Sequence, residues 1–161
     1  MNAVDETRAR QLFERYDGSL FFMSRDGADV EYRTFAVPRA TEVAWLADLT
    51  ARKVATLGQP GRFRAIAFLV HHSDFSHVSD VVTADIQGNG SDQLNYLREA
   101  LAYVAEAVRR GAVDRGALDQ MSAIVTDRSL AVATQWPAAR DQAEALIQTA
   151  VRASAGESGA A

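Results

Sequence analysis

Residues 63–86 read FRAIAFLVHHSDFSHVSDVVTADI, and this stretch carries the argument for the fold. Its first eight residues form an almost continuous apolar run bounded by turn residues, which is typical of a buried strand. Residues 78–86 alternate between apolar and polar side chains, as a half-buried strand does. The two runs therefore predict a β-hairpin whose connection is residues 71–77.

Two further hairpins are predicted on either side of this one. Residues 20–23 and 30–35 are strand-like and flank Asp26-Gly27, a pair that supplies the positive φ of a tight hairpin turn. Residues 113–134 are ambiguous, because their first half fits a helix. For 122–134 we favour a hairpin that turns at 127–129, since β-branched residues cluster there.

Four stretches predict helices: 4–15, 41–57, 92–110 and a last one from Pro137 to Val151. The third is the strongest, with apolar residues stepping by three and four until Gly111 stops it. Hairpins followed by helices suggest repeated ββα units. We therefore expect an α+β fold with a mainly antiparallel sheet of four to six strands and helices packed on one face. Residues 1–152 would form a single domain and 153–161 a flexible C-terminal tail.

The composition excludes several functions. The chain of 161 residues has a net charge of −4, which argues against nucleic acid as a partner. It has no cysteine, so disulfides and thiolate metal sites are excluded. It has no apolar run long enough to span a membrane, and its first residues lack the apolar core of a secretory signal, so we expect a cytoplasmic location. Arginine supplies every basic residue except Lys53, as in proteins from GC-rich bacterial genomes.

All three histidines lie within seven residues, at His71, His72 and His77, beside Asp74. In the predicted hairpin, His71 would face His77 with about 4.5–5.5 Å between their Cβ atoms. The two rings could then share a divalent metal such as zinc, with Asp74 or His72 as a third ligand and water in the fourth position. An exposed polar tip explains the same residues more simply, and a pH-responsive contact is a third interpretation.

Aromatic residues are the candidates for contact with a partner. Phe75 lies at the predicted hairpin tip, and Tyr96 and Tyr103 lie one heptad apart beside the apolar seam of 92–110. If that flank is exposed, the two tyrosines could form a surface for a protein partner or a homodimer.

Other motifs are weaker. Residues 88–91 fit a turn and helix cap better than a phosphate loop, which needs a further glycine or a lysine. Ser73 and Ser76 lack the Gly-x-Ser-x-Gly context of a serine hydrolase.

These observations favour an interaction module without catalytic activity or cofactor, which acts through protein contacts or self-association. The alternative is a metal-dependent hydrolase with its site at residues 71–77. A ligand-sensing domain with a pocket between helix and sheet is a third hypothesis.

Overall fold

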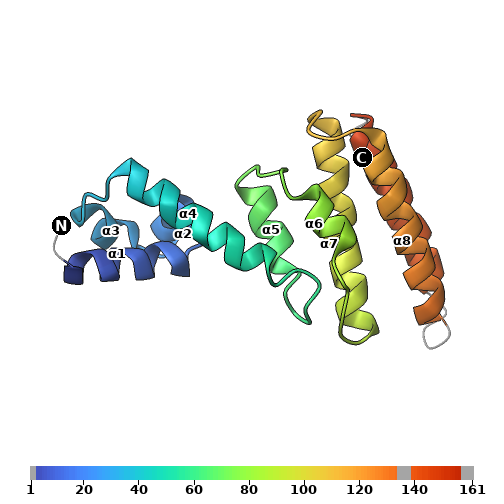
Figure 1. Ribbon diagram of the computed structural model, residues 1–161, viewed down its shortest axis with the longest axis horizontal. Coiled ribbons are helices and arrows are strands. Elements are labelled where there is room, and N and C mark those ends of the chain that lie inside the picture. Colours follow the sequence, from blue (N-terminus) through green and yellow to red (C-terminus); the bar gives the residue numbers. More distant parts are fainter. Residues whose placement is uncertain (1–2, 134–138, 157–161) are drawn as a thin grey trace. The chain divides into compact units, whose positions relative to one another are not determined.

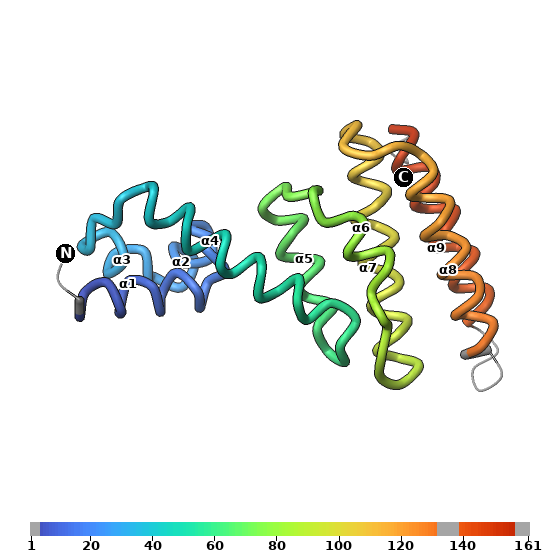
Figure 2. The backbone as a smooth tube through the Cα atoms, in the orientation of Figure 1, coloured from blue at the N-terminus to red at the C-terminus, as the bar shows by residue number. Residues whose placement is uncertain are grey.

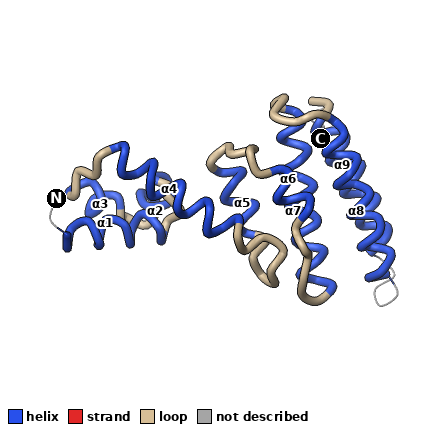
Figure 3. Tube along the Cα trace, in the orientation of Figure 1, coloured by secondary structure: helices blue, strands red, loops and turns tan. Residues whose placement is uncertain are grey.

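The computed structural model describes residues 3–133 and 139–156, and within these ranges every regular element is a helix (Figure 1, Figure 3). The prediction of an α+β fold with an antiparallel sheet is therefore wrong, and with it the proposed ββα repeat. In chain order the described helices are α1 Ala3–Arg15, α2 Leu20–Arg25, α3 Asp29–Thr34, α4 Arg39–Val54, α5 Arg64–His71, α6 Val78–Thr83, α7 Gly90–Arg109, α8 Arg115–Ala133 and α9 Ala139–Ser154.

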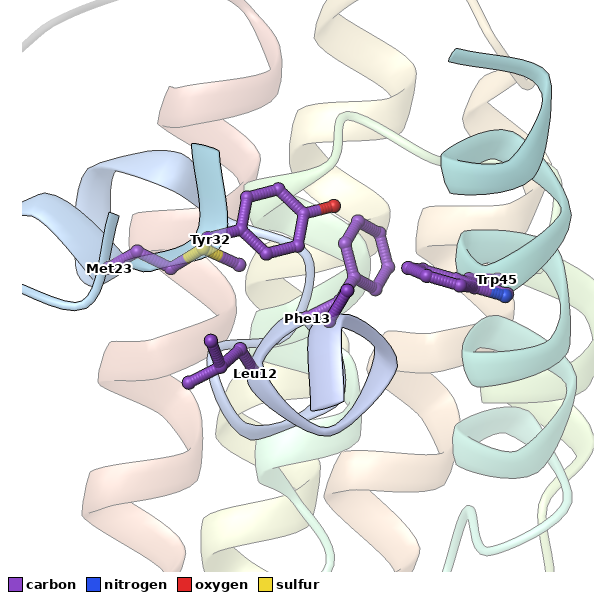
Figure 4. Packing of buried hydrophobic residues seen from close by; sticks show 6 residues of the cluster. Leu12, Phe13, Met23, Tyr32 and Trp45 are labelled. Atoms are coloured by element: carbon purple, nitrogen blue, oxygen red, sulfur yellow. The ribbon is translucent and has the colours of Figure 1, made fainter. Parts of the chain in front are cut away.

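The chain divides into two compact units, Met1–Ala55 and Thr56–Ala161. The first contains α1 to α4, and most of its buried side chains meet in one cluster: Ala9, Leu12, Phe13, Met23, Tyr32 and Trp45 (Figure 4). The indole of Trp45 packs edge-on against the ring of Phe13, with 5.7 Å between the ring centroids. Whether residues 1–152 behave as a single domain stays a prediction.

The segment predicted as the first hairpin forms two short helices, α2 and α3. Gly27 does have a positive φ of 74°, as the Asp-Gly pair indicated. It ends a helix, however, because the amide of Ala28 donates to the carbonyl of Met23 in the pattern of a Schellman cap. The glycine signal was correctly placed but belongs to a helix terminus.

The second predicted hairpin, residues 63–86, also forms two helices, α5 and α6. On α5 the buried residues are Ala65, Ile66, Phe68 and Leu69, which follow helical spacing. On α6 the buried residues are Val78, Val81 and Val82, again one face of a helix. On each of the two helices the apolar residues therefore bury one face, and residues such as Ala67 on α5 and Ser79 on α6 are exposed.

The expected helix at 92–110 is confirmed as α7, and those at 4–15 and 41–57 are confirmed as α1 and α4 within a few residues. Gly111 has a φ of 70° and ends α7 as predicted. The hairpin favoured for 122–134 is wrong, because residues up to Ala133 belong to α8. The proposed start of the last helix at Pro137 lies outside the described residues.

Helices α7, α8 and α9 pack against one another as a three-helix bundle, and α5 and α6 lie against α7 (Figure 2). The bundle core is built from side chains of α7 and α8 with no exposed surface, including Leu97, Val104, Leu118 and Met121. Helix α9 adds the small residues Ala143 and Ala150, which allow close approach. It extends to Ser154, so the predicted tail from residue 153 begins inside a helix, and 157–161 lie outside the described residues.

Across the described ranges, we find no helix that combines the length and the apolar character needed to cross a membrane.

Candidate functional site

The histidine segment connects α5 to α6 within the second unit. His71 is the last residue of α5, residues 72–77 form the loop, and His77 occupies the N-cap position of α6 without a capping hydrogen bond from its side chain. Because helices replace the two predicted strands, His71 and His77 do not face each other across a hairpin. The ring of His71 instead lies edge-on to that of His72, with 5.0 Å between the ring centroids.

The imidazole of His77 lies near two carboxylates. Its Nδ1 atom is 2.8 Å from Oδ2 of Asp80, and its Nε2 atom is 3.8 Å from Oδ2 of Asp74. Burial raises the pKa of Asp74, but hydrogen bonds from the hydroxyl and amide of Ser76, together with the nearby histidines, lower it by more. The pKa of Asp74 is therefore below its ordinary value, and its carboxylate is ionised at neutral pH.

The metal hypothesis loses its geometric basis here. It required His71 and His77 to converge, and in the described part of the chain no three histidine, aspartate or glutamate side chains are placed to hold a metal ion. Metal binding by His71, His72, Asp74 and His77 stays a prediction.

The loop is anchored to α7 by the aromatic residue that the sequence singled out. Phe75 stacks on Tyr103 with 5.3 Å between the ring centroids, and the Tyr103 hydroxyl donates to the backbone carbonyl of Asp74 at 2.7 Å. The guanidinium of Arg110 lies over the ring of Phe75, 5.1 Å from its centroid, and donates to the hydroxyl of Ser73 at 3.2 Å. The loop 72–77 is thus fixed by aromatic packing and by hydrogen bonds from Tyr103 of α7 and from Arg110, the residue that follows α7.

The two candidate tyrosines are buried. Tyr103 is inaccessible, and Tyr96 donates its hydroxyl to the carbonyl of Val81 at 2.9 Å. Burial raises the pKa of both phenols. The condition under which they would contact a partner was exposure of this flank of α7, and the structure instead places it against the α5–α6 segment.

Phe75 borders an open groove of about 600 Å³ in the second unit. One wall comes from the loop and α6, and the other from the α7–α8 connection and the first turns of α8. Its lining mixes apolar side chains with hydroxyl, amide and carboxylate groups. The described lining residues are Phe75, Ser76, Val78, Ser79, Val82, Thr83, Ala112, Val113, Asp114, Gly116, Ala117 and Gln120.

Sequence reasoning singled out residues on one wall of this groove and none on the other. The sequence singled out Phe75 as an isolated aromatic residue, whereas it left residues 113–134 ambiguous between a helix and a hairpin. The available signal was the succession of small residues, Ala112, Gly116 and Ala117, directly after the stop at Gly111. Small side chains leave space beside a neighbouring helix, but only the tertiary structure shows that α6 lies there.

Comparison of the chain with models of protein families, with curated proteins and with solved structures gave no match. The described residues therefore define the class only by their architecture, a two-unit helical protein whose second unit carries a groove beside its bundle.

Proposed function

We propose that this protein is an interaction module whose second unit binds a short segment of a partner protein in the groove beside Phe75. The observation that carries the proposal is the groove itself, which combines apolar side chains with polar groups. Binding sites of this kind have mostly apolar linings with a few polar groups that fix orientation. The volume of about 600 Å³ suits a few side chains of a bound segment.

The apolar side chains of the lining support a modest affinity. Burial of one large aliphatic side chain contributes about 1.5–3 kcal/mol, and a groove of this size holds two or three of them. Association also costs several kcal/mol of lost translational and rotational freedom. We therefore expect a transient complex with a dissociation constant in the micromolar range.

The carboxylates beside the groove indicate which charged residue the bound segment carries. Asp114 is the charged residue among the described lining residues, and Asp80 carries a largely exposed carboxylate next to the lining residue Ser79. A lysine or arginine beside the apolar side chains of the bound segment would complement these carboxylates. We accordingly expect an amphipathic segment with a basic residue.

Two of the lining hydroxyl groups already donate hydrogen bonds within the protein. The Ser76 hydroxyl donates to Oδ1 of Asp74 at 2.6 Å, and the Thr83 hydroxyl donates to the carbonyl of Ser79 at 2.8 Å. No histidine is among the lining residues that the structure describes. Because these hydroxyl groups already have acceptors within the protein, contacts with a bound segment rest mainly on the apolar lining residues.

Photo-crosslinking in the native cells tests the proposal. Benzoylphenylalanine in place of Gln120, at the groove rim, should crosslink one defined protein, identified by mass spectrometry. The same group at Ala123, exposed on the same helix, is the matched control and should not. Ala117→Phe fills the groove and should reduce the Gln120 crosslink at least fivefold, whereas the control Ala123→Phe should leave it unchanged. A crosslink that forms equally at both positions, or that survives Ala117→Phe, would contradict the proposal.

A further inference from the structure

The first unit contains a separate pocket that the proposed groove does not explain. It has a volume of about 330 Å³ and lies where α1 ends and along one side of α2. Its described lining residues are Arg15, Tyr16, Asp17, Phe22, Arg25 and Asp26. Two arginines, two aspartates and two aromatic rings thus line one small, open pocket.

Arg15 differs from every other arginine of this unit. The side chains of Arg8, Arg10, Arg25, Arg33, Arg39 and Arg52 each form an ion pair with a carboxylate. Within the described part of the chain, Arg15 has no carboxylate at ion-pair distance, and its guanidinium instead lies over the ring of Tyr16, 5.4 Å from the centroid. A cation at the edge of a pocket, without an internal counter-ion, is suited to pair with an anion from outside.

The other charges of the pocket do not neutralise Arg15. Oδ1 of Asp17 lies 2.6 Å from Nζ of Lys53, so this carboxylate already has a cation. Asp26 pairs at 3.0 Å with its neighbour Arg25, and both side chains are substantially exposed. Exposed pairs of this kind contribute about 0–1 kcal/mol, so Arg25 can exchange Asp26 for an incoming carboxylate at little cost.

An apolar surface lies directly beside these cations. Phe21 is 69% exposed and Leu20 is 49% exposed, both on α2. The ring of Phe21 lies 5.5 Å from that of Phe22, which lines the pocket and is itself covered by the guanidinium of Arg25. Energetically important positions of protein interfaces are enriched in aromatic residues and arginine, the combination found here.

We propose that this pocket and Phe21 together bind an acidic segment of a partner protein. A carboxylate of the segment pairs with Arg15, with Arg25 beside it, and a neighbouring apolar side chain packs on Phe21 and Phe22. The guanidinium fork matches a carboxylate geometrically, and its contact with an aromatic ring holds it in place before binding. The site is distinct from the groove of the second unit and prefers the opposite charge.

Selection from a library of random twelve-residue peptides, displayed on phage and panned on the immobilised full chain, tests this proposal. We expect enrichment of peptides with aspartate or glutamate next to an apolar residue. In a fluorescence polarisation titration, a synthetic peptide of this kind should bind at least tenfold more tightly than its amide twin, in which glutamine or asparagine replaces the acid.

Variants of the full chain locate the binding site. Arg15→Gln and Phe21→Ser should each weaken binding of the acidic peptide at least tenfold. The matched controls are Arg33→Gln, whose partner is Asp29, and Val30→Ser, whose side chain is 71% exposed on α3; both should change binding less than twofold. The groove variant Ala117→Phe should also leave this binding unchanged. The failure of the groove proposal can therefore be distinguished from the failure of this one. Circular dichroism verifies that each variant is folded.

Three results would overturn the proposal: no enrichment of acidic peptides, an acidic peptide that still binds both Arg15→Gln and Phe21→Ser, or self-association of the chain that Phe21→Ser abolishes in sedimentation experiments. The last result would identify a second copy of the chain as the occupant of the surface.

Discussion

Glu106 links ion pairing on α7 to the position of the loop 72–77. Its carboxylate accepts hydrogen bonds from Arg109 and Arg110, and Arg110 in turn covers Phe75 and donates to Ser73. The hydrogen bonds from the two arginines lower the pKa of Glu106 to about 2. One ionised carboxylate thus orients the cation that borders the groove wall.

Protonation of Glu106 should therefore destabilise the folded protein. A carboxyl group whose folded pKa lies below its unfolded value stabilises the fold above the unfolded pKa, and the contribution is lost as pH falls from about 4.5 towards about 2. Since solvent screens this partly exposed pair, we expect a contribution of about 1 kcal/mol at pH 7. Urea unfolding of wild type and Glu106→Gln should differ by this amount at pH 7 and converge near pH 2. A difference that is constant with pH would contradict the assignment.

At the scale of elements, α7 begins at a well-formed cap. The side-chain oxygen of Asn89 accepts from the amides of Ser91 and Asp92 at 2.9 and 3.0 Å. Asn89→Ala removes this acceptor and should cost about 1 kcal/mol of unfolding free energy, whereas Asn89→Asp keeps it and should cost less than half as much. Chemical denaturation followed by circular dichroism measures both. Equal losses in the two variants would show that the cap does not stabilise α7.

The long helix could be predicted from sequence because its apolar residues repeat over many turns and its stop at Gly111 is a glycine with positive φ. The short helices could not. In α6, Val78, Val81 and Val82 face the core at helical spacing, but Val78, Val82 and Ile86 also fit an alternating strand. A run of six to eight residues does not distinguish these periods, and β-branched valines favour the strand interpretation. Packing against α7 decides the outcome.

The same limit applies to the candidate site, where single residues could be chosen from the sequence but their arrangement in space could not. Phe75 borders the groove but is buried, so its contact with a partner stays a prediction; of the histidines, His72 and His77 lie in the α5–α6 loop and His71 ends α5. The metal geometry depended on a strand register and failed with it. The wall from Ala112 to Gln120 and the pocket beside Arg15 depend on which helices lie together, and local patterns carry no information about that.

At the scale of the whole molecule, the two units differ in how much core they possess. The second is built around a three-helix bundle with many inaccessible side chains, while the first has a small cluster and leaves Phe21 and Val30 exposed. A unit of about 55 residues buries only about 60% of its unfolded surface and is marginally stable by itself. We therefore expect the first unit to unfold before the second.

Trp45 provides a probe for this order of unfolding. It is 4% exposed in the core of the first unit, and the chain contains one other tryptophan, Trp136. In a Trp136→Phe variant, the fluorescence of Trp45 should report a urea midpoint at least 0.5 M below that of far-ultraviolet circular dichroism, which is dominated by the longer helices of the second unit; urea slopes of about 1–3 kcal/mol/M make such a gap measurable. Coincident midpoints would instead indicate one cooperative transition, as the single domain predicted for residues 1–152 requires. Because each proposed binding surface belongs to one unit, separate transitions would also allow a partner to stabilise one unit without the other.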